Sequence, residues 1–140
     1  MKKVLLGFVV VFVVLVLLDL LVHSVLLAGA YESMQNVWRP DMAQKMWILY
    51  IVKLFVAFFF SFIFSKGYEN KGIMEGVRYG FYMGLLLAVP YAYGSYASFA
   101  IPYSVALQWF IYALIEYIIA GVALALVFRT PASPAPTAQT

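Results

Sequence analysis

The first long apolar run of the chain reads VLLGFVVVFVVLVLLDLLVHSVLLAGA and covers residues 4–30. An α-helix rises about 1.5 Å per residue, so about 20 apolar residues cross the roughly 30 Å hydrocarbon core of a bilayer. Further apolar runs of spanning length follow at residues 46–65, 73–92 and 101–128. Continuous apolar runs are typical of helices, because barrel strands alternate apolar with polar residues. We therefore expect an all-α fold in which every run is a transmembrane helix.

The overall composition also indicates a membrane protein. Of the 140 residues, 66% are apolar and 11% are charged, and the mean hydropathy is +0.95. A soluble domain has roughly 45–50% apolar and about 25% charged residues. Cysteine is absent from the sequence, which excludes disulfides and thiolate metal sites. Basic residues are not gathered into a patch with aromatic residues between them, and we expect no nucleic-acid partner.

The helix boundaries follow from local sequence. We predict a polytopic membrane protein at 1–129, a four-transmembrane-helix bundle with helices at about 4–30, 42–65, 73–92 and 101–128. Asp41 after Pro40, with Gln44 three residues on, resembles a capping box, so the second helix should begin near residue 42. Pro90 should kink or end the third helix near its outer end. The Pro/Ala/Thr-rich tail at 130–140 cannot form a core and should be disordered.

Lysine and arginine residues are divided unevenly between the two sides of the predicted bundle. Two of them, Arg39 and Lys45, lie in the connection between the first and second helices. Six lie on the opposite side: Lys2, Lys3, Lys66, Lys71, Arg78 and Arg129. Because short cytoplasmic segments carry the excess of basic residues, both termini should face the cytoplasm.

The third helix carries a stripe of small residues at every fourth position: Gly76, Gly80, Gly84 and Ala88. Such a stripe makes one helix face nearly flat and lets a neighbouring backbone approach closely. Two interpretations remain open at this point. The stripe packs against another helix of the same bundle, or it forms a seam between copies of the chain.

Several polar residues lie inside the apolar runs, where charge is expensive and is usually paired or functional. Asp19 lies roughly 16 Å below the outer end of the first helix, with His23 at i+4, and Lys53 lies roughly 10 Å into the second. The fourth helix contributes a stripe at i, i+4 and i+8. The predicted polar cluster in the outer half of the bundle comprises Asp19, His23, Lys53, Gln108, Tyr112 and Glu116.

Three interpretations of this cluster remain open. In the structural one, Lys53 forms a buried ion pair with Asp19 or Glu116, and a neighbour satisfies His23. In the functional one, a water-accessible pocket opens outward, and Asp19, His23 and Glu116 carry protons or bind a small polar ligand. In the third, the cluster lies at a subunit interface and its charges pair with another protein.

Several segments resemble a family of small bacterial inner-membrane proteins with four helices. They are Asp19 with His23, the sequence Trp38-Arg39-Pro40, and residues 93–96 and 101–110. The resemblance extends over residues 4–129. It implies a bacterial inner-membrane location and a compact bundle, and it brings no activity that can be carried over.

The sequence holds no phosphate-binding loop, no nucleophile beside a base and no zinc-binding helix. We therefore name no catalytic residue, and we expect neither a cofactor nor a bound metal. Our first hypothesis is a non-enzymatic accessory or structural component of a membrane assembly, in contact with the lipid bilayer and with itself or a larger complex. The main alternative is a small proton-coupled transporter or channel that uses the polar cluster. A third is a lipid- or quinone-linked membrane enzyme subunit.

Overall fold

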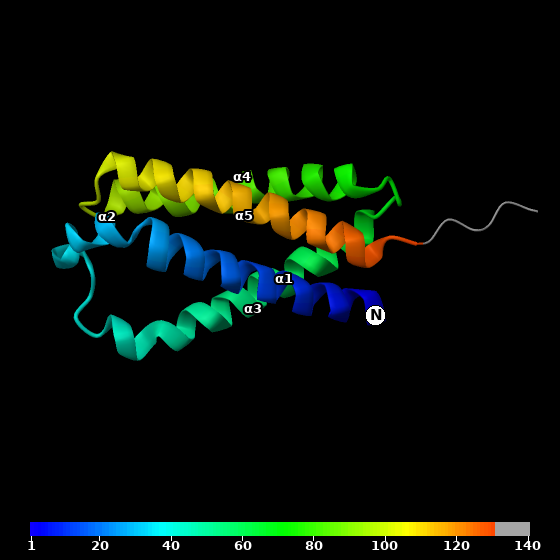
Figure 1. The fold of residues 1–140 in the computed structure, drawn as a ribbon, viewed down its shortest axis with the longest axis horizontal. Helices are drawn as coiled ribbons and strands as arrows, with labels where there is room; N and C mark the ends of the chain where they lie inside the picture. Colours follow the sequence, from blue (N-terminus) through cyan, green and yellow to red (C-terminus); the bar gives the residue numbers. More distant parts are fainter. Residues whose placement is uncertain (131–140) are drawn as a thin grey trace, which may run out of the picture.

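A computed structural model describes residues 1–130 of the chain, and within that range the fold is all-helical (Figure 1). The α-helices are α1 (Lys2–Leu21), α2 (Ala28–Glu32), α3 (Met42–Gly67), α4 (Ile73–Ser98) and α5 (Tyr103–Phe128). A π-helical turn, Val22–Leu26, follows α1, and a 3-10 turn, Gln35–Val37, follows α2. The tail predicted to be disordered lies, from residue 131 on, outside the described residues.

The four long helices run along the long axis of the molecule (Figure 1). Helix α4 packs along α5, α5 also packs against α1, and α1 packs against α3. Helix α3 diverges from the other helices toward the end at which it begins, as Figure 1 shows. The expected compact bundle is therefore formed by α1, α4 and α5, and α3 packs on it mainly through α1.

Three helical segments are long and apolar enough to cross a membrane: Lys2–Leu26, α3 and α5. Helix α4 has 26 residues but is not among them. It contains Glu75, Arg78, several glycines and several tyrosines, which lower its mean hydropathy. By composition alone, the described residues thus support three of the predicted spans.

The prediction of four helices is wrong in number, because the first apolar run is divided. Helix α1 passes into the π-helical turn and the regular helix stops at Leu27, where φ is −100° and ψ is 0°. The short helix α2 follows. Apolar residues lie on both sides of this break, so hydropathy did not reveal it.

Two predictions about helix ends also need correction. Helix α3 begins at Met42 as predicted, but the Asp41 side chain makes no cap hydrogen bond. Asp41 instead binds Arg39, with 2.6 Å between Oδ1 and Nε, and Lys45, with 3.5 Å between Oδ2 and Nζ. Helix α4 continues through Pro90 to Ser98, so the predicted end near residue 92 is wrong.

The stripe of small residues on α4 packs against α5. A Cβ atom on Gly76 would collide with the carbonyl oxygen of Gly121, and one on Gly80 with the carbonyl oxygen of Tyr117. At Gly84 it would lie 2.8 Å from Leu114 Cδ1. Ala88 is buried as well. Of the two open interpretations, packing within the chain is confirmed, and this face is not free for a second copy.

The buried apolar residues form two clusters. The inner cluster includes Val11, Leu15, Phe60, Phe64, Leu124 and Phe128. The outer cluster includes Val22, Leu27, Met34, Ile101, Val105 and Trp109. On α1, Asp19 lies between Leu15 and Val22, and on α5, Glu116 lies between Trp109 and Leu124. The two clusters are thus separated by a layer that contains charge.

Candidate functional site

An ion pair joins α1 to α3 in this layer. The Lys53 ammonium group contacts Asp19 Oδ2, and the two side chains are 22% and 28% exposed. Pairing of Lys53 with Asp19 or Glu116 was predicted, and Asp19 is the partner. Lys53 also lies at the place where α3 leaves the bundle: the buried residues of α3 begin only at Ala57.

Glu116 is the buried acid of the layer. Its side chain is 6% exposed, and Oε1 has no hydrogen-bond partner among the described residues. The predicted approach of Lys53 to a carboxylate is therefore shown for Asp19, whereas no ion pair joins Glu116 to Lys53 among the described residues. These three residues, here called the charged trio, carry two negative charges and one positive charge when all are ionised.

His23 lies in the π-helical turn and reaches a different partner. Its Nδ1 atom is 2.5 Å from Tyr31 Oη, which also accepts a hydrogen bond of 2.6 Å from Trp109 Nε1. Since the indole can only donate, the Tyr31 proton is available to His23. Burial raises the pKa of Tyr31, so the phenol keeps this proton at neutral pH.

Four aromatic rings form a cluster on the outer side of the charged trio. This aromatic cluster consists of Tyr31, Trp38, Tyr91 and Trp109. The Tyr91 ring stacks on Trp109 with 5.2 Å between centroids, and Tyr31 meets Trp38 edge-on at the same distance. The role of Tyr31 was not predicted from the sequence. Tyr31 follows His23 by eight residues, and the turn at Leu27 lies between them. Without knowledge of this turn, the spacing does not predict their hydrogen bond.

Two residues of the predicted polar stripe do not join the trio. Gln108 Nε2 donates to the carbonyl oxygen of Ser104 in its own helix, at 3.1 Å, on the exposed side. Tyr112 packs against the outer apolar cluster. Of the three polar residues on α5, Glu116 is therefore the one that faces charge.

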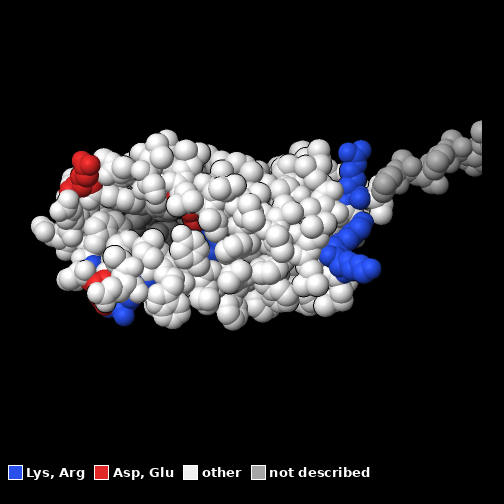
Figure 2. Space-filling view, turned by 60° about the horizontal axis from the view of Figure 1, so that its bottom comes forward, with Lys and Arg blue, Asp and Glu red and all other residues white. Residues whose placement is uncertain are grey.

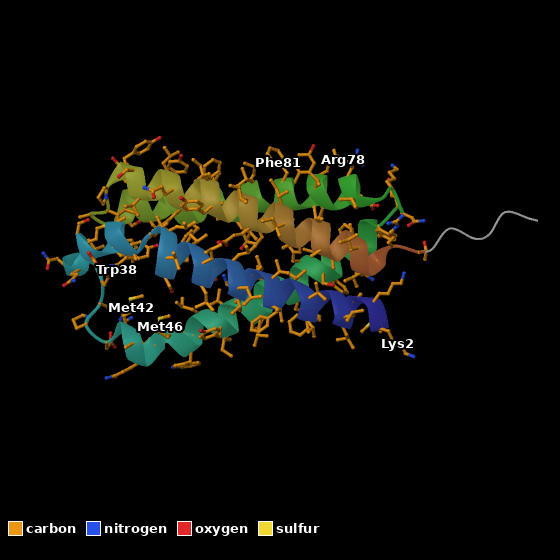
Figure 3. All side chains as sticks on the ribbon, in the orientation of Figure 1. Lys2, Trp38, Met42, Met46, Arg78 and Phe81 are labelled. Atoms are coloured by element: carbon orange, nitrogen blue, oxygen red, sulfur yellow. The ribbon has the colours of Figure 1, made fainter. Side chains whose placement is uncertain are left out.

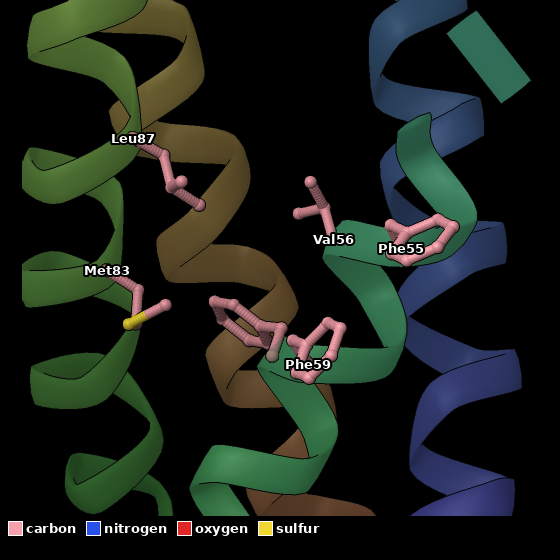
Figure 4. A pocket seen from close by; sticks show the side chains of 6 residues that line it. Phe55, Val56, Phe59, Met83 and Leu87 are labelled. Carbon is pink, nitrogen blue, oxygen red and sulfur yellow. The ribbon is translucent and has the colours of Figure 1, made fainter. Parts of the chain in front are cut away.

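The layer is reached from the half of the molecule opposite its basic end. Figure 2 shows lysine and arginine side chains gathered at one end, and a hollow in the other half that ends at an acidic and a basic side chain. A separate apolar groove of about 210 Å³ lies between α3 and α4, lined by Phe55, Val56, Phe59, Phe60, Met83 and Leu87 (Figure 4).

Residues 1–130 contain no group of three His, Cys, Asp or Glu side chains that could hold a metal ion. Comparison with known proteins found no matching family model, no matching curated protein and no matching solved structure.

Proposed function

We propose that the chain is an integral membrane protein with four spans, of which α4 is one. Helices α3 and α5 are apolar enough to cross a membrane, and α4 connects the end of α3 to the start of α5. These two points lie at opposite ends of the molecule (Figure 1). If α3 and α5 cross the bilayer, the connecting helix crosses it too. Packing along α5 shields the small-residue face of α4 from lipid.

The orientation follows from the basic residues. Lys2 and Arg78 lie toward the same end of the molecule (Figure 3). Lys66, Lys71 and Arg129 belong to segments that meet at that end. We place this end in the cytoplasm of a bacterial cell, with the chain in the inner membrane, because basic residues are retained on the cytoplasmic side.

The role we propose is that of a non-enzymatic component of a membrane assembly. The observation behind this proposal is that α3 is buried against other helices along only part of its length. Its buried residues are Ala57, Phe60, Ser61 and Phe64, whereas all seven residues from 46 to 52 are exposed. Helices α4 and α5, in contrast, have buried residues along most of their length.

A partner helix fits this geometry. Transmembrane helices associate through close packing, because lipid tails remove the hydrophobic drive. The groove beside the exposed part of α3 is lined by six apolar side chains, so it suits the apolar face of another membrane helix. The partner packs beside Phe55, whose side chain is 63% exposed.

Site-specific photo-crosslinking in native membranes tests this role. Phe55→benzoylphenylalanine places the probe beside the groove (Figure 4), and Phe81→benzoylphenylalanine, on the outer side of α4 (Figure 3), is the matched control. Phe81 is 41% exposed. We expect a discrete protein adduct from position 55 and lipid adducts from position 81. Lipid adducts alone from both positions would refute the assembly role.

A second candidate function is a small proton-coupled transporter or channel. The observation that favours it is the buried Glu116 carboxyl, whose Oε1 atom has no hydrogen-bond partner among the described residues. Protein reconstituted in liposomes should then dissipate a pH gradient, and Glu116→Gln should abolish the flux while Gln108→Ala keeps it. Equal flux through the wild type and Glu116→Gln rules out this candidate.

A further inference from the structure

We propose that the outer face of α4 binds an anionic phospholipid, and that Arg78 holds its phosphate group at the basic end of the molecule. This inference rests on the proposed crossing of the membrane by α4. It holds equally for a component of an assembly and for a transporter. Its evidence is an exposed guanidinium group without a carboxylate partner and an exposed apolar face beside it.

Arg78 is an exposed cation inside α4 and not in the connection before it. It lies five residues beyond Ile73, which corresponds to roughly 7.5 Å of helix. Its guanidinium group forms no ion pair within residues 1–130. The two carboxylates nearest to it in the sequence are engaged elsewhere. Glu69 contacts the Lys71 ammonium group, and Glu75 accepts the backbone N–H groups of Glu69 and Lys71 at 2.6 and 2.8 Å. The positive charge of Arg78 is therefore uncompensated.

The side chains that follow Arg78 along the outer face of α4 are large and mostly apolar. The glycine face of the helix packs against α5, so the opposite face is left exposed. Arg78 and Phe81 both lie on this outer side (Figure 3). Tyr82 and Leu86, one and two turns beyond Arg78, are exposed as well. One helix face thus carries a cation near its end and an apolar surface toward its middle.

This combination of charge and apolar surface fits a phospholipid with a negative headgroup. A guanidinium group binds a phosphate group through two parallel N–H···O bonds. The long arginine side chain can extend to the headgroup layer while its backbone lies deeper. The acyl chains then lie along Phe81 and Leu86. A soluble phosphate compound would leave this apolar face without a role.

Photo-crosslinking in lipid nanodiscs of defined composition tests the site. Phe81→benzoylphenylalanine places the probe three residues from Arg78, and the discs contain equal amounts of phosphatidylglycerol and phosphatidylcholine. We expect phosphatidylglycerol adducts to exceed phosphatidylcholine adducts in mass spectra. Arg78→Gln should lower this adduct ratio about fivefold, the contribution of one basic residue near anionic lipid. Equal amounts of the two adducts in the wild type, or an unchanged ratio in Arg78→Gln, overturns the proposal.

Lys2→Gln is the matched control, because Lys2 is an exposed cation at the same end of the molecule but on α1 (Figure 3). It should leave the adduct ratio unchanged. A drop as large as that in Arg78→Gln would mean that all basic residues of this end attract anionic lipid alike, and it overturns a site at Arg78.

A competition measurement keeps Arg78 in place and so does not depend on the folding of Arg78→Gln. Soluble glycerol phosphate, added in excess, should not lower the adduct ratio at position 81. A ratio that falls to one would mean that the site recognises phosphate without acyl chains, which overturns a lipid site. Lipid adducts without preference for a headgroup refute this inference alone. Absence of any lipid adduct at position 81 refutes the proposed span as well, so the two failures are distinguishable.

Discussion

The inner and outer halves of the molecule are built by opposite means. In the inner half, glycines bring α4 and α5 into backbone contact, and Tyr79 connects α4 to α3 through a 2.6 Å hydrogen bond to the carbonyl oxygen of Phe60. In the outer half, the buried residues of α3 begin only at Ala57, Glu116 is buried, and His23 and Tyr31 are half-buried. Small residues therefore close one half, whereas the other half contains charged groups and aromatic rings.

Lys53→Met should have the largest effect, because it removes the cation at the boundary between the halves. Asp19 and Glu116 would then hold two negative charges with no ammonium group beside them. Loss of one partner of a buried ion pair costs about 3–5 kcal/mol. We expect the lower end of this range, since the Lys53 and Asp19 side chains are 22% and 28% exposed. Chemical unfolding in detergent measures the change.

The double variant Asp19→Asn/Lys53→Met is the control for this prediction. It removes one of the two uncompensated charges, so part of the lost free energy of unfolding should return. The single variant Asp19→Asn completes the cycle. If the losses in unfolding free energy of Lys53→Met and Asp19→Asn simply add up in the double variant, the two side chains do not interact.

Gly80→Ala should weaken the inner half by about 1–3 kcal/mol, because overpacking forces backbones apart. The new Cβ would collide with the carbonyl oxygen of Tyr117. Gly94→Ala in the same helix is the matched control, since a Cβ there meets no heavy atom within 4 Å. Equal unfolding free energies for the two variants would contradict the close α4–α5 seam.

Tyr31→Phe should destabilise the outer half by about 1–2 kcal/mol, the usual cost of leaving buried polar groups without partners. Both Trp109 Nε1 and His23 Nδ1 lose the hydroxyl that they share. Tyr103→Phe is the control, because the Tyr103 side chain is 54% exposed. If both variants unfold at the same temperature, the hydrogen-bond chain does not stabilise this half.

The smallest effect is expected at Asp41, in the outer connection. Its hydrogen bond to Arg39 holds the pKa of the Asp41 carboxyl below its usual value. The folded state thus binds fewer protons than the unfolded state, and the stabilisation is present at neutral pH and lost as pH falls through the lowered pKa. The wild type should exceed Asp41→Asn slightly in stability at pH 7, and the difference should vanish in acid. A difference that grows in acid would show the opposite shift.

Much of the helical framework was predictable from the sequence. The boundaries at Met42 and Phe128 follow from hydropathy and local residue preferences, which act over a few residues. The approach of Lys53 to Asp19 was predictable, because charged side chains in apolar helices turn toward one another.

The remaining features depend on contacts between distant residues. The break at Leu27 lies in uninterrupted apolar sequence, and its consequence is the contact of Tyr31 with Trp109, 78 residues away. Gln108 was assigned to the polar cluster from helical spacing. That spacing does not show that its amide finds an acceptor at Ser104, one turn earlier. Helix α3 diverges because its outer part does not pack against the other helices. Contacts of this kind join distant parts of the sequence, so no local sequence pattern predicts whether they form.

Solid-state NMR in lipid bilayers tests the charged layer most directly. The chain contains two aspartates, Asp19 and Asp41, so in an Asp41→Asn background every lysine–aspartate contact involves Asp19. We predict a strong dipolar coupling between ¹⁵Nζ of Lys53 and ¹³Cγ of Asp19. Absence of that coupling in folded protein would mean that α1 and α3 do not bring their charges together in the membrane.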